Sequence, residues 1–384
     1  MRVFLWRLFF SVLLPLILTG CQDSTPLSGD NQLRLSVAET LGGNELAGYV
    51  RATQPRDFIF PQDHGPHPEF KTEWWYYTGN LQNTTGRRFG YQLTFFRSAL
   101  LPDQVVRDSA WASRQVYLAH FALTDPAGRK FHHFERFSRA ALGLAGASAE
   151  PFQVWLENWS ASGPGPDSLP MRLQAAAGEV KIDLELDSLK PIVLQGDQGL
   201  SRKSADPGNA SYYYSLTRMP TRGFIHLGEE RFSVTGQSWL DREWSTSALG
   251  ENQVGWDWFS LQFDDGRELM YYQLRLQNGQ ADPLSSGVLV MADGSSQRLT
   301  PQDVDLEILQ HWTSPHSRGK YPAHWRLKVP KHRLDLEIIP LLADQELQAS
   351  VRYWEGAVSI KGRADEKYLR GYGYVELTGY ERVD

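Results

Sequence analysis

Three acidic residues, Glu73, Asp241 and Asp257, stand in strongly aromatic segments of this 384-residue chain. A carboxyl group buried among apolar rings can keep its proton at neutral pH and act as a general acid. The same group can instead pair with arginine, which is favoured for Glu73, or accept hydrogen bonds that order a β-barrel. The three residues are therefore candidate catalytic acids, each with a structural alternative.

Aromatic side chains near these acids are candidates for binding an apolar ligand. Side chains alternate between the two faces of a β-strand, so Glu73 shares a face with Trp75 and Tyr77, and Asp241 shares one with Trp239. The full set of candidate binding residues is Trp75, Tyr77, Tyr212, Tyr214, Trp239, Trp244, Trp256 and Trp258.

Several familiar catalytic motifs are missing from the sequence. It contains no GxSxG nucleophile motif, no HExxH zinc motif and no Walker loop. His64 and His67 lie in a Gly/Pro loop, which indicates a structured segment rather than a metal site. His120 shares a strand face with apolar residues and is predicted to be a buried, hydrogen-bonded core histidine. No metal site is predicted.

Composition excludes further classes of protein. The chain has 39 Lys and Arg against 45 Asp and Glu, and this net charge of −6 argues against binding nucleic acid. A single cysteine excludes a disulfide framework. Hydrophobic residues make up 41% and aromatic residues 12% of the chain, which is enough for a folded core. The length predicts two domains, or three.

Alternating apolar and polar residues predict an all-β protein from about Phe58 onward. Turn-forming residues separate the alternating segments, and many short strands with regular turns are typical of a sandwich or barrel. The predicted strands are Phe89–Phe96, Gln115–Leu123, Phe131–Phe137, Phe152–Trp159, Val180–Leu186, Ser211–Leu216, Phe232–Trp239, Trp256–Phe263, Leu269–Leu276, Val288–Met291, Trp325–Val329, Leu334–Ile339, Ala357–Ile360 and Tyr372–Leu377.

A faint internal repeat indicates a duplicated domain. The segment from Trp74 to Leu93 and the segment from Trp256 to Leu274 share an aromatic triplet, a Leu-Gln pair, a Gly-Arg turn and a Tyr-Gln-Leu end. Both read as a β-hairpin, and they lie about 180 residues apart. Chance similarity between two aromatic hairpins is the alternative. A period this long indicates duplication of a whole domain rather than a solenoid.

The N-terminus has the pattern of a secretory signal. Two arginines precede an apolar run from Leu8 to Leu18, which is too short to span a bilayer comfortably. The residues Leu-Thr-Gly-Cys that end at Cys21 resemble a bacterial lipobox, so residues 1–20 are the expected signal peptide and Cys21 the expected lipid-anchored residue. Residues 21–50 are the expected anchor and tether. The expected location is the cell envelope, anchored by lipid at the outer membrane and facing the periplasm.

The aromatic motifs as a group resemble one family of secreted proteins. The run from Glu73 to Asn80, the segment Trp239–Trp244 and the segment 255–259 resemble the AttH-like family, which includes the carotenoid 1,2-hydratases and members labelled as secreted hydrolases. The resemblance extends from about Phe58 to Tyr380. It implies two tandem lipocalin-like β-barrels, expected at residues 51–238 and 239–384.

The resemblance also implies a reaction that needs no cofactor. In the hydratases a carboxylic acid protonates an isolated double bond, aromatic faces stabilise the cation, and water adds. The aromatic-x-Asp motif of the family corresponds to Trp239-x-Asp241, where the hydratases favour tyrosine over tryptophan. Tyr212 and Tyr214 are predicted to line the same cavity as Asp241. The expected partner is a hydrophobic isoprenoid or lipid, and the alternatives are a hydratase, a hydrolase and a non-catalytic lipocalin-like carrier.

Overall fold

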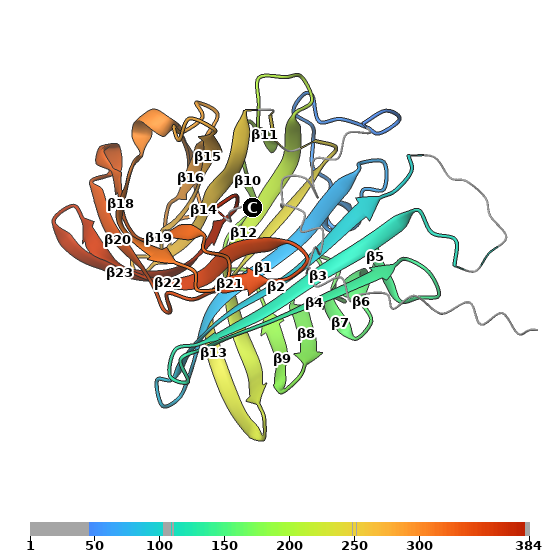
Figure 1. The fold of residues 1–384 in the computed structure, drawn as a ribbon, viewed down its shortest axis with the longest axis horizontal. Helices are drawn as coiled ribbons and strands as arrows, with labels where there is room; N and C mark the ends of the chain where they lie inside the picture. Colours follow the sequence, from blue (N-terminus) through green and yellow to red (C-terminus); the bar gives the residue numbers. More distant parts are fainter. Residues whose placement is uncertain (1–45, 103–108, 110, 248, 251, 381–384) are drawn as a thin grey trace, which may run out of the picture. The chain divides into compact units, whose positions relative to one another are not determined.

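Two antiparallel β-sheets form the part of the chain that the structure describes (Figure 1). The structure is a computed structural model, and it describes residues 46–102, 109, 111–247, 249–250 and 252–380. The expected signal peptide and Cys21 lie outside these residues. No helix among the described residues is long and apolar enough to cross a membrane. The all-β prediction is confirmed.

The N-terminal sheet contains thirteen strands. Its spatial order is β4-β3-β2-β1-β13-β12-β9-β8-β7-β6-β5, and β10 and β11 both pair with β12. Its strands are β1 (Thr72–Asn83), β2 (Arg88–Ala99), β3 (Gln115–Asp125), β4 (Lys130–Arg139), β5 (Ala145–Ala149), β6 (Phe152–Leu156), β7 (Trp159–Gly163), β8 (Met171–Ala177), β9 (Val180–Leu186), β10 (Val193–Leu194), β11 (Leu200–Arg202), β12 (Ala210–Leu227) and β13 (Glu230–Ser245).

The C-terminal sheet contains ten strands. Its order is β17-β16-β15-β14-β23-β22-β20-β19-β18, and β21 pairs with β22. Its strands are β14 (Gln253–Phe263), β15 (Glu268–Leu276), β16 (Ser286–Val290), β17 (Ser296–Leu299), β18 (Asp305–Thr313), β19 (Lys320–Val329), β20 (Leu334–Pro340), β21 (Glu346–Gln348), β22 (Arg352–Ala364) and β23 (Lys367–Leu377). The described residues also contain the 3₁₀ turns Gln62–His64, Pro301–Asp303 and Pro330–His332.

The two sheets share part of their topology, as the repeat predicts. Each begins with four sequential antiparallel strands, β1 to β4 and β14 to β17, and in each the last strand pairs with the first, β13 with β1 and β23 with β14. The repeated segments form the hairpins β1–β2 and β14–β15. The sheets divide between Ser245 and Gln253, so the expected boundary at residue 239 falls inside β13.

Most predicted strands coincide with observed ones, but one predicted segment contains two. The segment Phe152–Trp159 covers β6, a turn and the first residue of β7. Glu157 has a positive φ of 55° in this turn. Such backbone is uncommon for a residue with a side chain and cannot be read from an alternating apolar pattern.

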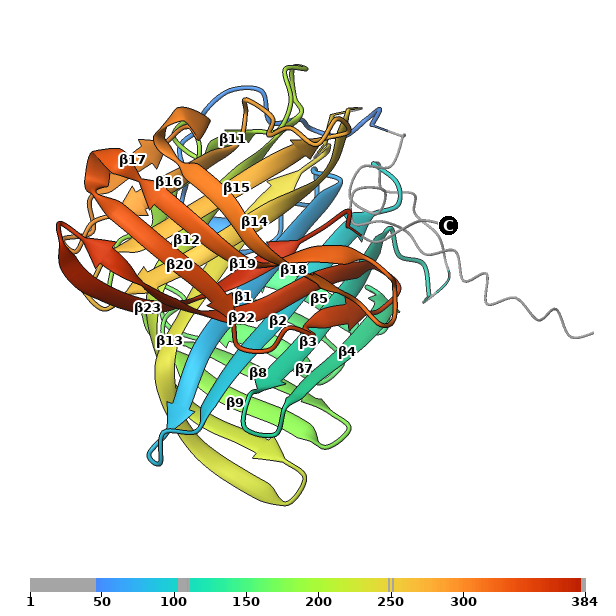
Figure 2. The same cartoon turned by 60° about the vertical axis from the view of Figure 1, so that its left-hand side comes forward.

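Figures 1 and 2 show that both sheets are curled. Each sheet encloses its own apolar core, and another apolar cluster lies between the sheets. Strand β22 lies against β2, and β23 lies against β1. The sheets approach so closely that a Cβ atom on Gly90 of β2 would overlap the Cβ atom of Ala357 on β22. The strands β1, β12 and β13 therefore have two buried faces, one toward the first barrel core and one toward the second sheet.

Candidate active site

The register of three central strands divides the predicted site residues between two opposite faces. Residues directly opposite each other in an antiparallel ladder point to the same face. Asp241 of β13 lies opposite Tyr76 of β1 and opposite Ser215 of β12. Trp75 lies opposite Arg242 and so points to the other face. The residues expected to form one site thus belong to two separate environments.

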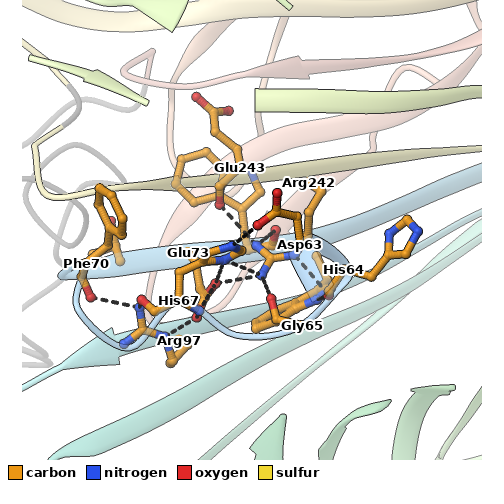
Figure 3. A network of polar contacts seen from close by, with 12 residues as sticks. Asp63, His64, Gly65, His67, Phe70, Glu73, Arg97, Arg242 and Glu243 are labelled. Carbon is orange, nitrogen blue, oxygen red and sulfur yellow. Dashed lines mark hydrogen bonds and ion pairs between the residues drawn. The ribbon is translucent and has the colours of Figure 1, made fainter. Parts of the chain in front are cut away.

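Glu73 lies on the face toward the first barrel, within a buried ion-pair network (Figure 3). Its carboxylate accepts hydrogen bonds from Arg97, from Arg242 at 2.6 Å and from the backbone N–H of His67 at 3.0 Å. Burial opposes ionisation, but the charges of Arg97 and Arg242 outweigh it and hold the pKa of Glu73 well below its usual range. This geometry favours the structural alternative for Glu73, because an acid held ionised donates no proton.

Five of the predicted aromatic residues lie on the same side as Glu73. Trp244 stacks on His67 with ring centroids 3.7 Å apart, and the Arg242 guanidinium lies 3.8 Å from the Trp75 ring centroid. The five residues are Trp75, Tyr77, Tyr212, Tyr214 and Trp244. The expectation that Tyr212 and Tyr214 line the cavity of Asp241 is corrected by the register, which places them opposite Trp244 and Arg242.

Asp241 lies on the face toward the second sheet, where its side chain contacts uncharged donors. It accepts hydrogen bonds from Tyr213, from Ser215 at 2.5 Å and from the Trp239 indole N–H at 2.6 Å. The residue is only 3% exposed, and burial raises its pKa to about 7 despite these hydrogen bonds. Asp241 can therefore hold a proton near neutral pH and release it to a nearby base.

Aromatic rings from both sheets surround Asp241. Trp258 of β14 donates a hydrogen bond to the Tyr213 hydroxyl at 3.2 Å, and its ring meets Tyr76 edge to face at a centroid distance of 5.1 Å. The buried members of this inter-sheet cluster are Tyr76, Tyr213, Trp239, Trp258, Met270, Tyr272, Leu274, Ala357 and Tyr374. The half-buried rings of Trp74 and Trp256 pack at its edge. The cluster supplies apolar surface and aromatic faces beside the Asp241 carboxyl.

Asp257 lies on the opposite side of β14, facing the core of the second barrel. Its carboxylate lies 3.0 Å from Nε of Arg275 and accepts a hydrogen bond from Tyr380 at 2.9 Å. Burial raises the pKa of Asp257, although the charge of Arg275 and the hydrogen bond from Tyr380 oppose the rise. The structure does not bring Asp257 together with Asp241, and its partners favour the barrel-ordering alternative. Trp256 and Trp258 point the other way, toward the inter-sheet cluster.

The sequence matches a known family over most of its length. A family model described as AttH-like matches residues 51–380. The chain belongs to the AttH-like family. A crystal structure of an AttH protein from Nitrosomonas europaea is 35% identical to this chain, with a TM-score of 0.78, and the alignment covers 87% of this chain and 100% of that one.

Two kievitone hydratases are more distant relatives of this AttH-like chain. The enzyme of Fusarium solani subsp. phaseoli is 21% identical over 213 residues, which cover 54% of this chain and 59% of that protein. The chain thus spans less than two thirds of that relative's length. The crystal structure of kievitone hydratase from Nectria haematococca is 16% identical, with a TM-score of 0.65, and the alignment covers 86% and 97% of the two chains. This second likeness concerns the fold.

Of the three hydrogen-bond donors to Asp241, sequence reasoning identified Trp239 and missed Tyr213 and Ser215. In this AttH-like chain Tyr213 donates a hydrogen bond to Asp241 and Tyr76 lies opposite it, whereas the sequence pattern points to their neighbours Tyr212, Tyr214, Trp75 and Tyr77. The segments around both tyrosines are aromatic on both strand faces. The sequence therefore shows that side chains alternate between two faces, but it does not show which face packs against the second sheet. Glu243 also lies on this face, where Lys203 pairs with it at 3.0 Å.

Proposed function

We propose that this protein hydrates an isolated carbon–carbon double bond of an apolar isoprenoid, without a cofactor, and that Asp241 is the proton donor. The single observation that carries the proposal is the buried Asp241 carboxyl with its pKa near 7, held by three uncharged donors beside aromatic rings. The kievitone hydratases add support, because their name describes addition of water by proteins that resemble this chain.

The expected chemistry follows from the contacts of Asp241. Its carboxyl proton transfers to the less substituted carbon of the double bond, and the π electrons form the new C–H bond. The positive charge that develops on the other carbon is stabilised by the faces of Tyr76, Trp239 and Trp258. A water oxygen then forms the C–O bond and loses one proton to a base, which gives a tertiary alcohol. The sum of these steps is addition of one water.

Turnover of an isoprenoid probe tests the proposal. We expect the full-length protein in detergent to add oxygen from H₂¹⁸O and deuterium from D₂O to squalene, which has trisubstituted double bonds. Asp241→Asn should lower the rate at least about 100-fold, since general acid catalysis contributes that much or more.

The matched control is Asp125→Asn, which alters a buried aspartate that pairs with Arg87 at 2.7 Å. This variant should retain turnover. If squalene binds but no isotope is incorporated, the result would contradict the hydratase and favour the non-catalytic carrier. A protein that neither binds nor converts squalene would contradict an apolar isoprenoid site.

We also propose that Cys21 carries a lipid that keeps the protein at the membrane, facing the periplasm, where apolar substrates partition. The lipobox-like residues before Cys21 motivate this proposal. Metabolic labelling with a fatty acid should mark the wild-type protein and not Cys21→Ser, and only the wild type should sediment with outer membranes. Equal labelling of both proteins would contradict the anchor.

A further inference from the structure

The second sheet repeats the carboxyl motif of the first at the equivalent strand position. Trp239-x-Asp241 lies on β13, which pairs with the first strand of its sheet, and Tyr374-x-Glu376 lies on β23, which pairs with the first strand of the other. Asp241 lies opposite Tyr76, and Glu376 lies opposite Trp258. The duplication thus provides two aromatic-x-carboxyl centres.

The two centres meet across one aromatic contact. Tyr76 and Trp258 occupy equivalent positions of the repeat and touch edge to face, with centroids 5.1 Å apart. The Trp256 indole N–H donates to Glu376 at 2.8 Å. Burial raises the pKa of Glu376 to about 7, and the charge of Asp241 adds to the rise, so the two carboxyls are within electrostatic reach. The ring contact thus places the two aromatic-x-carboxyl centres next to each other across the sheets.

Glu376 does not act alone, because Glu355 of β22 lies directly opposite it. Glu355 is 1% exposed and accepts a hydrogen bond from the Tyr76 hydroxyl. Hydroxyl and indole groups, rather than cations, contact this pair. Two carboxylates directly opposite each other and buried cannot both ionise at low cost, so the pair holds one proton between them at neutral pH.

A row of polar side chains leads from the neighbourhood of this pair toward the surface. Tyr353 lies two residues before Glu355 on the same strand face, and its hydroxyl hydrogen-bonds to Nδ1 of His120 at 2.6 Å. Burial and the charge of Glu355 raise the pKa of Tyr353 well above its usual range. Nε2 of His120 lies 3.0 Å from the Glu135 carboxylate, which is 25% exposed. His120 is thus buried and hydrogen-bonded, as predicted, but its partners lie on both sheets.

We infer that Glu355 and Glu376 together are the base that takes the proton from the attacking water, and that Tyr353, His120 and Glu135 conduct that proton to solvent. This inference rests on the proposed hydration. In each turnover Asp241 loses one proton to carbon and regains one from solvent, while the carboxyl pair gains one from water and releases one to solvent. Protons therefore balance, and the net reaction consumes one water.

The shared proton is measurable without any substrate. In an Asp241→Asn background, infrared spectra of the full chain at neutral pH should show a protonated-carboxyl band that Glu355→Gln/Glu376→Gln removes. The control is Glu346→Gln, which changes a buried glutamate on β21 that hydrogen-bonds to Ser314 and Tyr321. An unchanged band in the double variant would overturn the inference, whatever the activity of the protein.

Isotope incorporation distinguishes failure of the base from failure of the acid. With squalene, Glu355→Gln/Glu376→Gln should still exchange deuterium into recovered alkene, because Asp241 remains, but ¹⁸O incorporation should fall at least about 100-fold. Asp241→Asn should lose both signals. Loss of deuterium exchange in the glutamate double variant, with its fold intact, would assign the pair to protonation and overturn its role as base. If the wild-type protein incorporates neither deuterium nor ¹⁸O, the proposed function is contradicted. The infrared spectra would still decide whether Glu355 and Glu376 share a proton.

A variant of Tyr353 tests the proposed proton path. Tyr353→Phe keeps the ring and removes the hydroxyl that hydrogen-bonds to His120. We expect kcat to fall while KM stays within about threefold, and the solvent deuterium isotope effect on kcat to rise, because proton release becomes limiting. The groups facing the pair are Tyr76, Tyr353, Tyr374, His120, Asp241 and Glu243. An unchanged isotope effect and kcat would remove Tyr353 from the proton path.

Discussion

Glu73→Gln is expected to lower the free energy of unfolding by about 3–5 kcal/mol, the usual cost of breaking a buried ion pair. The substitution keeps the shape of the side chain but leaves the guanidinium groups of Arg97 and Arg242 buried around an uncharged amide. Both arginines are at most 1% exposed, so water cannot replace the lost carboxylate. Denaturant unfolding with linear extrapolation measures the change.

The matched control for this prediction is an exposed ion pair of the same sheet. Asp183 pairs with Arg172 at 2.8 Å, and the Arg172 side chain is 56% exposed. Asp183→Asn should therefore change stability by less than about 1 kcal/mol. A Glu73→Gln protein that is as stable as wild type but fails to incorporate deuterium would contradict the structural role and return Glu73 to the catalytic candidates.

The network around Glu73 explains why this residue looked like a candidate acid. Sequence shows an acid beside four aromatic residues, and it also shows Arg242 within the second aromatic motif. It does not show that β1 and β13 are neighbours with Glu73 opposite Trp244, which brings Arg242 onto the Glu73 face. The pairing of strands about 170 residues apart depends on the closure of the barrel, and no local pattern specifies it.

The fold was more accessible to sequence reasoning than the site. Alternation of apolar and polar residues identifies strands from a few adjacent residues, and the internal repeat predicts a duplicated arrangement of strands. Asp241 was also found, because Trp239-x-Asp241 is a local motif. Glu355 and Glu376 were missed, although each is the only acidic residue of its strand. The two glutamates matter because they lie opposite each other on neighbouring strands. That pairing depends on the register of the two strands, which neither sequence segment shows by itself.

Asp241→Asn is expected to make the protein more stable above neutral pH while it removes activity. The folded-state pKa of Asp241 is about 7, raised from 3.8 by burial. Because the folded state binds this proton more tightly than the unfolded chain, the stability contributed by the protonated carboxyl is complete below the unfolded pKa. It is lost progressively as pH rises through the folded pKa.

The size of this effect follows from the shift of the pKa. A shift of about three pH units corresponds to about 4 kcal/mol, as an upper bound. The free energy of unfolding of Asp241→Asn should therefore rise relative to wild type by up to about 4 kcal/mol between about pH 4 and about pH 8. Both proteins contain the other titrating groups, whose contributions cancel except that of Glu376, because the charge of Asp241 raises its pKa. Urea unfolding of the two proteins across this pH range gives the comparison.

The control for this pH dependence is Asp125→Asn, because the buried Asp125 is paired with Arg87. Its difference from wild type should not grow with pH over the same range. Parallel stability profiles for Asp241→Asn and wild type would mean that Asp241 is ionised in the folded protein and cannot be the proton donor. A stability gain that coincides with lost deuterium incorporation would instead mean that the chain retains a destabilising carboxyl because its proton is needed, since active sites hold strained or desolvated groups at the expense of stability.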